Sequence, residues 1–276
     1  MYEILDHLPA EARVLDLGSN AGSFPAEAYR FTTVRVDMAT PGRGAPALVQ
    51  ADAARLPFRS RAFDAVILNH SIEHFDNVKR ALQEVGRVLK MEGAAFASVP
   101  DATTIADRVY RRVYRNGGGH VNLFNSPVQL AEMLSWYFRL PHVATRTLCS
   151  SFSFLNRGNT ASSVVRRQMR FRGVPERLLA LLTGLLRSLD RRLQTRSSVY
   201  GWAFYFGNVP EPVCPTAYTN VCIRCGQGNP SDWLARHGTV RKKWRLLEYY
   251  HCPACGAANV YTRDVEFGHL KGVFPR

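Results

Sequence analysis

Short apolar runs alternate with amphipathic segments along the first half of the chain. The runs at residues 13–18, 31–36, 47–50, 63–68 and 94–99 are typical of buried strands. Between the last two, the segment from Asn77 to Lys90 repeats its apolar residues at helical spacing. Ser23 and Pro25 predict the start of another helix, since serine caps helices and proline suits the first turn. The alternation predicts an α/β fold with a doubly wound, mostly parallel, Rossmann-like sheet.

The pattern continues more weakly after Pro100. Residues 107–115 and 126–137 are expected to be helical, and the strands at 142–148 and 200–206 are expected to form an antiparallel pair at the end of the sheet. A basic helical insertion, residues 150–198, lies between these two strands. Within it, residues 175–193 place leucines on one helix face, opposite arginines that include Arg177 and Arg187.

A proline-rich stretch divides the chain. Pro210, Pro212 and Pro215 predict a stiff linker after residue 208. We therefore expect a larger domain over residues 1–208 and a small domain over residues 209–276.

The first strand runs into a glycine-rich turn, Val14-Leu-Asp-Leu-Gly-Ser-Asn-Ala-Gly22. Gly18 and Gly22 allow the backbone to turn sharply and approach a ligand closely, and Asn20 tolerates left-handed backbone angles. Such a turn is a weak signal by itself, because nicotinamide cofactors use one too.

Three acids lie at the ends of three successive strands. Asp16 precedes the glycines, where a carboxylate suits a cationic ligand and would repel a pyrophosphate. Asp37 has the spacing of an acid that binds ribose hydroxyls, and Asp52 ends the third strand. Each could be a solvated acid when taken alone. Because ligands bind at the carboxyl ends of parallel strands, the three together favour a binding site.

The segments VLDLGSNAG, VRVDMA, QADAARLPFRSRAFDAVILNHSIEHFDN, ALQEVGRVLKMEG and GGHVNLF resemble the class I S-adenosylmethionine-dependent methyltransferases, in particular the family called methyltransferase type 11. The resemblance covers roughly residues 10–140, and it departs from the usual pattern where Asn20 replaces the middle glycine. It implies a methyltransferase with S-adenosylmethionine as cofactor, and these donor-binding residues: Asp16, Gly18, Ser19, Asn20 and Gly22 for the methionine part, Asp37 and Met38 for the ribose, Asp52 and Ala53 for the adenine, and Asn69 and His70 beside the donor.

The sulfonium of the donor already activates its methyl group, so the enzyme mainly aligns the two reactants. A hydroxyl acceptor also needs a base to take its proton. His70 and His120 are the candidate catalytic residues, and His120 follows three glycines in a loop that could face an acceptor or anchor itself. For His74, a structural hydrogen bond at a helix start is the favoured role.

Four of the six cysteines form two C-x-x-C-G motifs separated by 26 residues. Cys222, Cys225, Cys252 and Cys255 predict a closed tetrahedral site for structural zinc, in a module that resembles a zinc ribbon. The metal would offset the small core of so short a segment. The basic, aromatic stretch between the motifs could bind nucleic acid, but a solvated face is favoured.

The formal net charge of +14 favours an anionic partner, and residues 157–196 carry ten arginines against two acids. The leading prediction is methylation of oxygen on a small molecule or glycan. An RNA methyltransferase is the alternative, although strand four lacks the Asn/Asp-Pro-Pro-aromatic motif of base methylation. Two further alternatives are a membrane-surface enzyme for a lipid-linked substrate, which binds through residues 175–193, and a non-enzymatic scaffold. For residues 175–193, packing of the leucine face on the domain's own core is favoured over lipid binding.

The chain lacks an apolar run of about 18 residues, and acids precede the first strand where a signal peptide would be basic. We expect a cytoplasmic protein, with peripheral binding to the inner face of the membrane if residues 175–193 lie on lipid.

Overall fold

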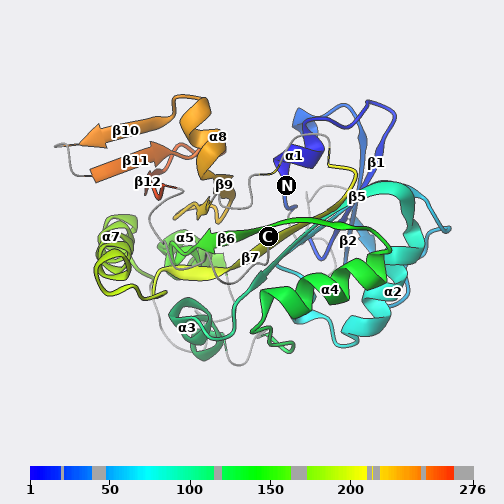
Figure 1. The fold of residues 1–276 in the computed structure, drawn as a ribbon, viewed down its shortest axis with the longest axis horizontal. Helices are drawn as coiled ribbons and strands as arrows, with labels where there is room; N and C mark the ends of the chain where they lie inside the picture. Colours follow the sequence, from blue (N-terminus) through cyan, green and yellow to red (C-terminus); the bar gives the residue numbers. More distant parts are fainter. Residues whose placement is uncertain are drawn as a thin grey trace. The chain divides into compact units, whose positions relative to one another are not determined.

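The computed structural model describes residues 1–19, 22–38, 48–114, 120–162, 173–209, 213, 218–243 and 247–263. The chain forms two compact units, each assembled from three stretches of sequence (Figure 1). Unit 1 contains Met1–Pro100, His120–Thr145 and Trp202–Pro215, and unit 2 contains Asp101–Gly119, Arg146–Gly201 and Thr216–Arg276. The cysteine-rich segment and most of the predicted insertion thus share one unit. The sequence predicted two domains separated by a single boundary after residue 208, whereas each compact unit combines several separate stretches of the chain. The predicted domain boundary stays a prediction.

The sheet of unit 1 has the strand order β3-β2-β1-β4-β5-β7-β6, and β6 and β7 continue into unit 2. β1 pairs in parallel with β2 and β4, as do β2 with β3 and β4 with β5. The bounds are β1 Arg13–Leu17, β2 Thr32–Asp37, β3 Leu48–Gln50, β4 Phe63–Asn69, β5 Leu89–Pro100, β6 His142–Cys149 and β7 Val199–Gly207. The predicted mostly parallel sheet is confirmed.

β7 runs antiparallel to both of its neighbours. At one end of the β6–β7 pair, the Gly207 N–H donates to the Pro141 carbonyl. At the other end, the Ser150 N–H donates to the Ser198 carbonyl. The hydrogen bonds that flank the β5–β7 pair have the same antiparallel sense: Asn208 to Gly93 and Asp101 to Tyr200. The antiparallel strands predicted at the end of the sheet are therefore present, and β7 lies between β5 and β6.

Two helices, α2 Val78–Val88 and α4 Pro127–Phe138, pack side by side against the unit 1 sheet (Figure 1). Both begin as the sequence predicts, because the side chains of Asn77 and Ser126 accept hydrogen bonds from backbone N–H groups in the first turn. Their apolar faces share one buried core with the sheet, which includes Leu15, Leu17, Val66, Leu68, Leu82, Val85, Leu130, Leu134, Phe204 and Phe206.

The other face of this sheet carries less helix than predicted. Tyr205 points to that face, since Phe204 and Phe206 on either side of it belong to the core under α2 and α4. Its hydroxyl donates to Glu3 of the short helix α1, Tyr2–Leu5. The helix predicted from Ser23 and Pro25 is wrong: a single 3₁₀ turn, η1 Ala26–Ala28, forms without a side-chain cap. Only residues 18–31 separate β1 from β2, which leaves too little chain after the glycine turn for a stable helix.

Unit 2 combines helices with short strands. β8 pairs in parallel with the end of β6 and antiparallel with β9, whereas β10, β11 and β12 form a separate antiparallel sheet. Its buried core includes Ala106, Phe152, Leu179, Leu234 and Tyr250. The elements are α3 Ile105–Val113, α5 Arg157–Ser162, α7 Glu176–Leu193, β8 Thr219–Val221, β9 Gly228–Pro230, α8 Ser231–Arg236, β10 Val240–Lys243, β11 Leu247–His251 and β12 Ala258–Val260.

Together, the sheet and its helices confirm the predicted doubly wound α/β architecture with a small β module near the C-terminus. None of the helices in the described part of the chain has the length and apolar character needed to cross a bilayer.

Candidate functional site

The predicted donor-binding residues gather at one edge of the unit 1 sheet. β1, β2, β3 and β4 are mutually parallel, so their carboxyl ends point the same way. In the ladder, Leu17 lies opposite Val36 and Asp37 lies opposite Gln50, which aligns the ends of three strands. The residues at the carboxyl ends of these strands therefore lie close together at one edge of the sheet, although they are far apart in the sequence.

The glycines of the first turn have the backbone conformations that the sequence predicts. Gly18 has φ +69° and Gly22 has φ +110°, both in the region that side chains rarely adopt. A Cβ atom on Gly18 would lie 2.5 Å from Cβ of Ser71, which follows β4. The turn after β1 and the segment after β4 thus touch through a glycine that has no room for a side chain. Asn20 lies outside the described residues.

Asp16 is fully buried at the end of β1. One carboxylate oxygen accepts a hydrogen bond of 2.9 Å from the Ser23 N–H, whereas Oδ1 has no partner in the described part of the chain. Burial raises the pKa of Asp16, and the hydrogen bond to Ser23 and the nearby Arg35 oppose this shift only in part. A buried carboxylate with an unused oxygen suits a cationic ligand, so this residue fits the ammonium group of an amino-acid moiety. Ser19 is also buried, and its hydroxyl group has no hydrogen-bond partner among the described residues.

The predicted ribose and adenine residues lie along the same edge. Asp37 is the last residue of β2 and is half-buried, and Met38, which follows it, is exposed. Asp52 is exposed and accepts a hydrogen bond of 2.8 Å from the Ala54 N–H, whereas Ala53 is buried. The local turn therefore uses one oxygen of Asp52.

Asn69 and His70 follow β4 closely. The side chain of Asn69 accepts a hydrogen bond of 2.8 Å from the Ser98 hydroxyl. His70 has φ +53°, a left-handed conformation that costs a residue other than glycine about 1 kcal/mol or more. Its N–H donates to the carbonyl and the hydroxyl of Ser98, which hold this strained backbone in place. Strain of this kind is frequent at functional sites.

His120 lies beside the segment after β4. The N–H groups of Val121 and Asn122 donate to the Glu73 carbonyl at 2.9 and 3.0 Å, and the ring of His120 meets the ring of His74 edge to face at 5.1 Å. One oxygen of Glu73 and one nitrogen of each histidine lie within 4.8 Å of one another. The structure thus joins His74 and His120 to an acid that sequence analysis missed. The H-S-I-E-H spacing, with an acid next to a histidine at a strand end, was the available signal.

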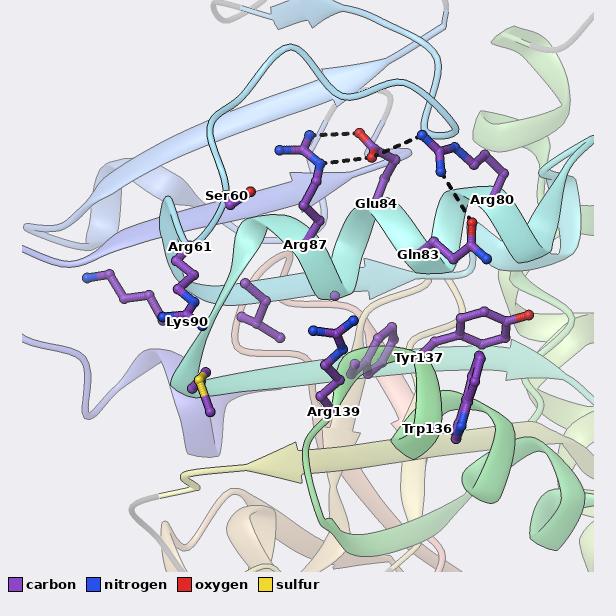
Figure 2. A pocket seen from close by; sticks show the side chains of 14 residues that line it. Ser60, Arg61, Arg80, Gln83, Glu84, Arg87, Lys90, Trp136, Tyr137 and Arg139 are labelled. Carbon is purple, nitrogen blue, oxygen red and sulfur yellow. Dashed lines mark hydrogen bonds and ion pairs between the residues drawn. The ribbon is translucent and has the colours of Figure 1, made fainter.

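A cavity of unit 1 lies on the outer surface of α2 and α4, away from the predicted site residues (Figure 2). It has a volume of about 930 Å³, and none of the predicted site residues line it. Arg80 and Arg87 both pair with Glu84 there, and Lys90 pairs with Asp64. Arg61, Arg139 and the exposed Trp136 complete a basic, partly aromatic lining.

The four predicted cysteine ligands converge in unit 2. Their sulfur atoms lie within 4.8 Å of one another, with 3.6 Å between Cys222 and Cys255 and 3.8 Å between Cys225 and Cys252. A tetrahedral ion with Zn–S bonds of about 2.3 Å places its sulfur atoms about 3.8 Å apart. The cluster therefore has the size and the soft donor set that zinc requires.

The two halves of the cluster share one hydrogen-bond pattern. Cys222 N–H donates to the Gln227 carbonyl and receives Gly226 N–H at its own carbonyl. Cys252 makes the same pair of bonds with Ala257 and Gly256. Both glycines have positive φ, +74° and +70°, so the trailing glycine of each motif is a conformational requirement.

At this centre hydrogen bonds between the sulfur atoms raise the pKa of Cys225 and lower that of Cys252, so the thiolate is favoured at Cys252. The neighbouring thiols of Cys222 and then Cys225 donate hydrogen bonds that lower the pKa of Cys252 below its ordinary value. Asn259 and the Arg224 N–H also point hydrogen-bond donors at the sulfur of Cys222. Such outer donors orient metal-binding side chains.

Helix α7 turns its leucines outward. The predicted helix is present, but packing of its leucine face on the domain core is wrong for all but Leu179 and the partly buried Leu186. Arg187, predicted on an exposed arginine face, is instead buried and donates to the Val260 carbonyl at 2.6 Å and to Asn220. The exposed leucines are Leu178, Leu181, Leu182, Leu185, Leu189 and Leu193.

The comparison with known families agrees with this geometry. Residues 15–97 match the family described as a methyltransferase domain. Residues 15–97 are thus similar to a methyltransferase domain, over about a third of the chain.

The individual proteins that resemble this chain match it at low sequence identity or over a limited length. The chain is 31% identical over 145 residues to the biotin biosynthesis bifunctional protein BioHC of Cellvibrio japonicus, a match that covers 47% of this chain and 28% of that protein. A methyltransferase from Archaeoglobus fulgidus, described as SAM-dependent, superposes with a TM-score of 0.48 and 19% identity, over 72% of this chain and 86% of that one. The 1,6-didemethyltoxoflavin-N1-methyltransferase of Burkholderia thailandensis gives a TM-score of 0.44 and 15% identity, over 74% and 73% of the two chains. The chain thus spans less than a third of the curated relative it matches.

We expect Asp16→Asn to make the ligand-free protein more stable than the wild type at pH 7. Because the pKa of Asp16 is raised in the folded state, the unfolded chain releases this proton more readily, and ionisation at neutral pH opposes folding. The difference in unfolding free energy between Asp16→Asn and the wild type should disappear as the pH falls through the raised pKa of Asp16 to below the ordinary value of 3.8. Urea unfolding of both proteins across this range measures it. The exposed Asp76→Asn serves as control, and equal shifts in both variants would contradict the assignment.

Loss of the cysteine cluster should unfold the β module of unit 2. Structural zinc contributes about 10–16 kcal/mol of apparent binding free energy in small zinc domains, so Cys225→Ser or a chelator should remove one zinc per chain and lower stability by several kcal/mol. Metal analysis and thermal unfolding test this. Cys149→Ser, at a buried cysteine of β6 outside the cluster, should keep its zinc. Full zinc content in Cys225→Ser would refute the four-sulfur site.

Proposed function

We propose that this protein is an S-adenosylmethionine-dependent methyltransferase that methylates an oxygen atom of a small molecule or glycan, and that the four cysteines hold structural zinc. The observation that carries the proposal is the gathering of Asp16, Asp37 and Asp52 around a glycine turn at the carboxyl edge of a parallel sheet. This edge binds ligands in open α/β folds.

The donor would lie across the ends of β1, β2 and β3. Asp16 and the turn Gly18–Gly22 would hold the methionine part, with the charge of Asp16 balanced by the ligand's ammonium group. Asp37 and Met38 would flank the ribose, Asp52 and Ala53 the adenine, and Asn69 and His70 the reacting end. S-adenosylmethionine supplies an electrophilic methyl group, so these residues mainly position it and keep water away.

An oxygen acceptor must lose a proton during the transfer. His70 and His120 are the side chains we propose for this step, because both lie near the end of β4, where the donor's methyl group would be. The cluster of His74, His120 and Glu73 supports a role in acceptor activation.

Calorimetric titration with S-adenosylmethionine and its demethylated product tests the donor site. We expect micromolar binding by the wild type and at least about tenfold weaker binding by Asp37→Ala, since the ribose hydroxyls lose a charge-assisted acceptor. Glu27→Ala, an exposed acid in η1, is the matched control and should bind normally. Absence of binding by a folded, zinc-loaded protein would reject the enzyme proposal and favour a scaffold.

A second candidate is an acceptor held at a membrane surface. The outward leucines of α7 lie at positions 178, 181, 182, 185 and 189, which is one face of a helix. Arg177, Arg191 and Arg192 are exposed on the same helix and could pair with anionic lipid headgroups. This arrangement supports peripheral binding at the inner face of the membrane. The basic cavity of Figure 2 supports RNA as a further alternative acceptor, to be included in the acceptor screen.

We expect the protein to co-sediment with vesicles that contain phosphatidylglycerol. Replacing Leu181 and Leu185 together by serine should weaken this binding at least about tenfold, because each buried leucine contributes about 1.5–3 kcal/mol. Met91→Ser, at an exposed apolar residue of unit 1, should leave binding unchanged. Equal sedimentation of the double variant and the wild type would exclude α7 as the lipid-binding surface.

A further inference from the structure

The carboxyl group of Glu73 is buried, and the described residues offer its oxygen atoms no hydrogen bond. It lies in the 3₁₀ turn η2, Ile72–His74, directly after β4, and its side chain is 1% exposed. Neither of its carboxylate oxygens has a hydrogen-bond partner in the described part of the chain, and Nδ1 of His70 lies 3.5 Å from Oε1. Burial of a carboxyl group without hydrogen bonds is unfavourable, and a ligand that binds its oxygen atoms would remove this cost.

Two imidazole rings converge on this carboxylate. His74 is the next residue, and His120 reaches the site from a distant loop. The loop is held by backbone bonds to the Glu73 carbonyl and by the Asn122 amide, which donates to the carbonyls of Ile72 and Phe75 at 3.1 and 2.7 Å. The position of His120 is therefore built into the fold of unit 1.

We propose that Glu73, His74 and His120 form a binding site for a first-row divalent metal ion. Their donor atoms lie within 4.8 Å of one another, and metal bonds of about 2.0–2.2 Å would draw them closer together. The ion would neutralise the buried charge of Glu73. Two imidazole nitrogens with one carboxylate favour zinc, iron or manganese over calcium, which prefers oxygen ligands alone.

The site lies next to the predicted donor. Ser71, two residues before Glu73, is the residue that a Cβ on Gly18 would meet, so the cluster adjoins the glycine turn. This part of the inference rests on the proposed methyltransferase function. A metal ion at this place limits the class of methyl acceptor to molecules with a hydroxyl group, or a pair of neighbouring hydroxyl groups, that can bind a cation.

A divalent cation lowers the pKa of a hydroxyl group that binds it. The acceptor hydroxyl would release its proton to water, and its oxygen would attack the methyl carbon. The C–S bond breaks with its electron pair kept by sulfur, so an alcohol and a sulfonium give an ether, a thioether and a proton. His74 and His120 then act as metal ligands, and His120 no longer needs to serve as the base.

Titration of the zinc-loaded full chain with Mn²⁺, followed by the electron paramagnetic resonance signal of the free ion, tests the site. The chain is loaded with one equivalent of zinc, which four thiolates bind more tightly than they bind manganese, so the cysteines stay occupied and the Glu73 site stays open to Mn²⁺. We expect one Mn²⁺ per chain in the wild type. Glu73→Gln, which keeps the buried volume, and His120→Ala should each weaken binding at least about tenfold.

Glu27→Gln and His7→Ala are the controls, since neither residue belongs to the cluster. Unchanged affinity in Glu73→Gln and His120→Ala, or no Mn²⁺ binding by the wild type, would overturn the metal site. The donor titration separates the two proposals. If the wild type binds the donor but not Mn²⁺, the metal site alone is rejected. If the wild type binds Mn²⁺, the variants do not, and no protein binds the donor, the metal site is kept and its catalytic role is rejected.

Discussion

The parallel pairing of β1 with β2 and β4 is the constraint on which the rest of unit 1 depends. It places Asp16 opposite Arg35 on one side and Ile67 on the other, and it brings the ends of these strands to one edge. A slip of one residue in either pair would turn the alternating side chains to the other face and separate the acids. The contact between Gly18 and Ser71 has little tolerance for such a slip, because it leaves no space for a Cβ atom.

The same edge concentrates features that oppose folding. Asp16 and Glu73 are buried carboxylates, each with oxygen atoms that lack partners among the described residues, and His70 has a strained backbone. Elsewhere in unit 1 a comparable buried acid is satisfied: Glu84 accepts hydrogen bonds from Arg87 and from the Leu56 N–H, which together lower its pKa. The contrast between satisfied and unsatisfied acids locates the region where ligands would complete the structure.

Unit 2 shows how a polar interior can redirect an amphipathic helix. Arg187 and Asp190 on α7 are buried, and Asp190 accepts hydrogen bonds from the N–H groups of Ser197 and Ser198. Because these groups need hydrogen-bond partners more than leucine needs burial, the polar side of the helix faces inward. The leucines are left at the surface, which makes a lipid or protein partner for this face a reasonable subject for experiment.

Local spacing allowed the sequence by itself to determine the strands of the sheet, the starts of α2 and α4, the glycine turn after β1 and the two C-x-x-C-G motifs. Each of these depends on residues only a few positions apart, and the physical rules of turns and periodicity act at that range. Only the tertiary structure decided that η1 replaces a helix, that Arg187 is buried, and that His120 meets Glu73 and His74. Those outcomes depend on the length of a connection, on hydrogen-bond partners from distant segments and on loops brought together by the sheet, and a linear pattern records none of them.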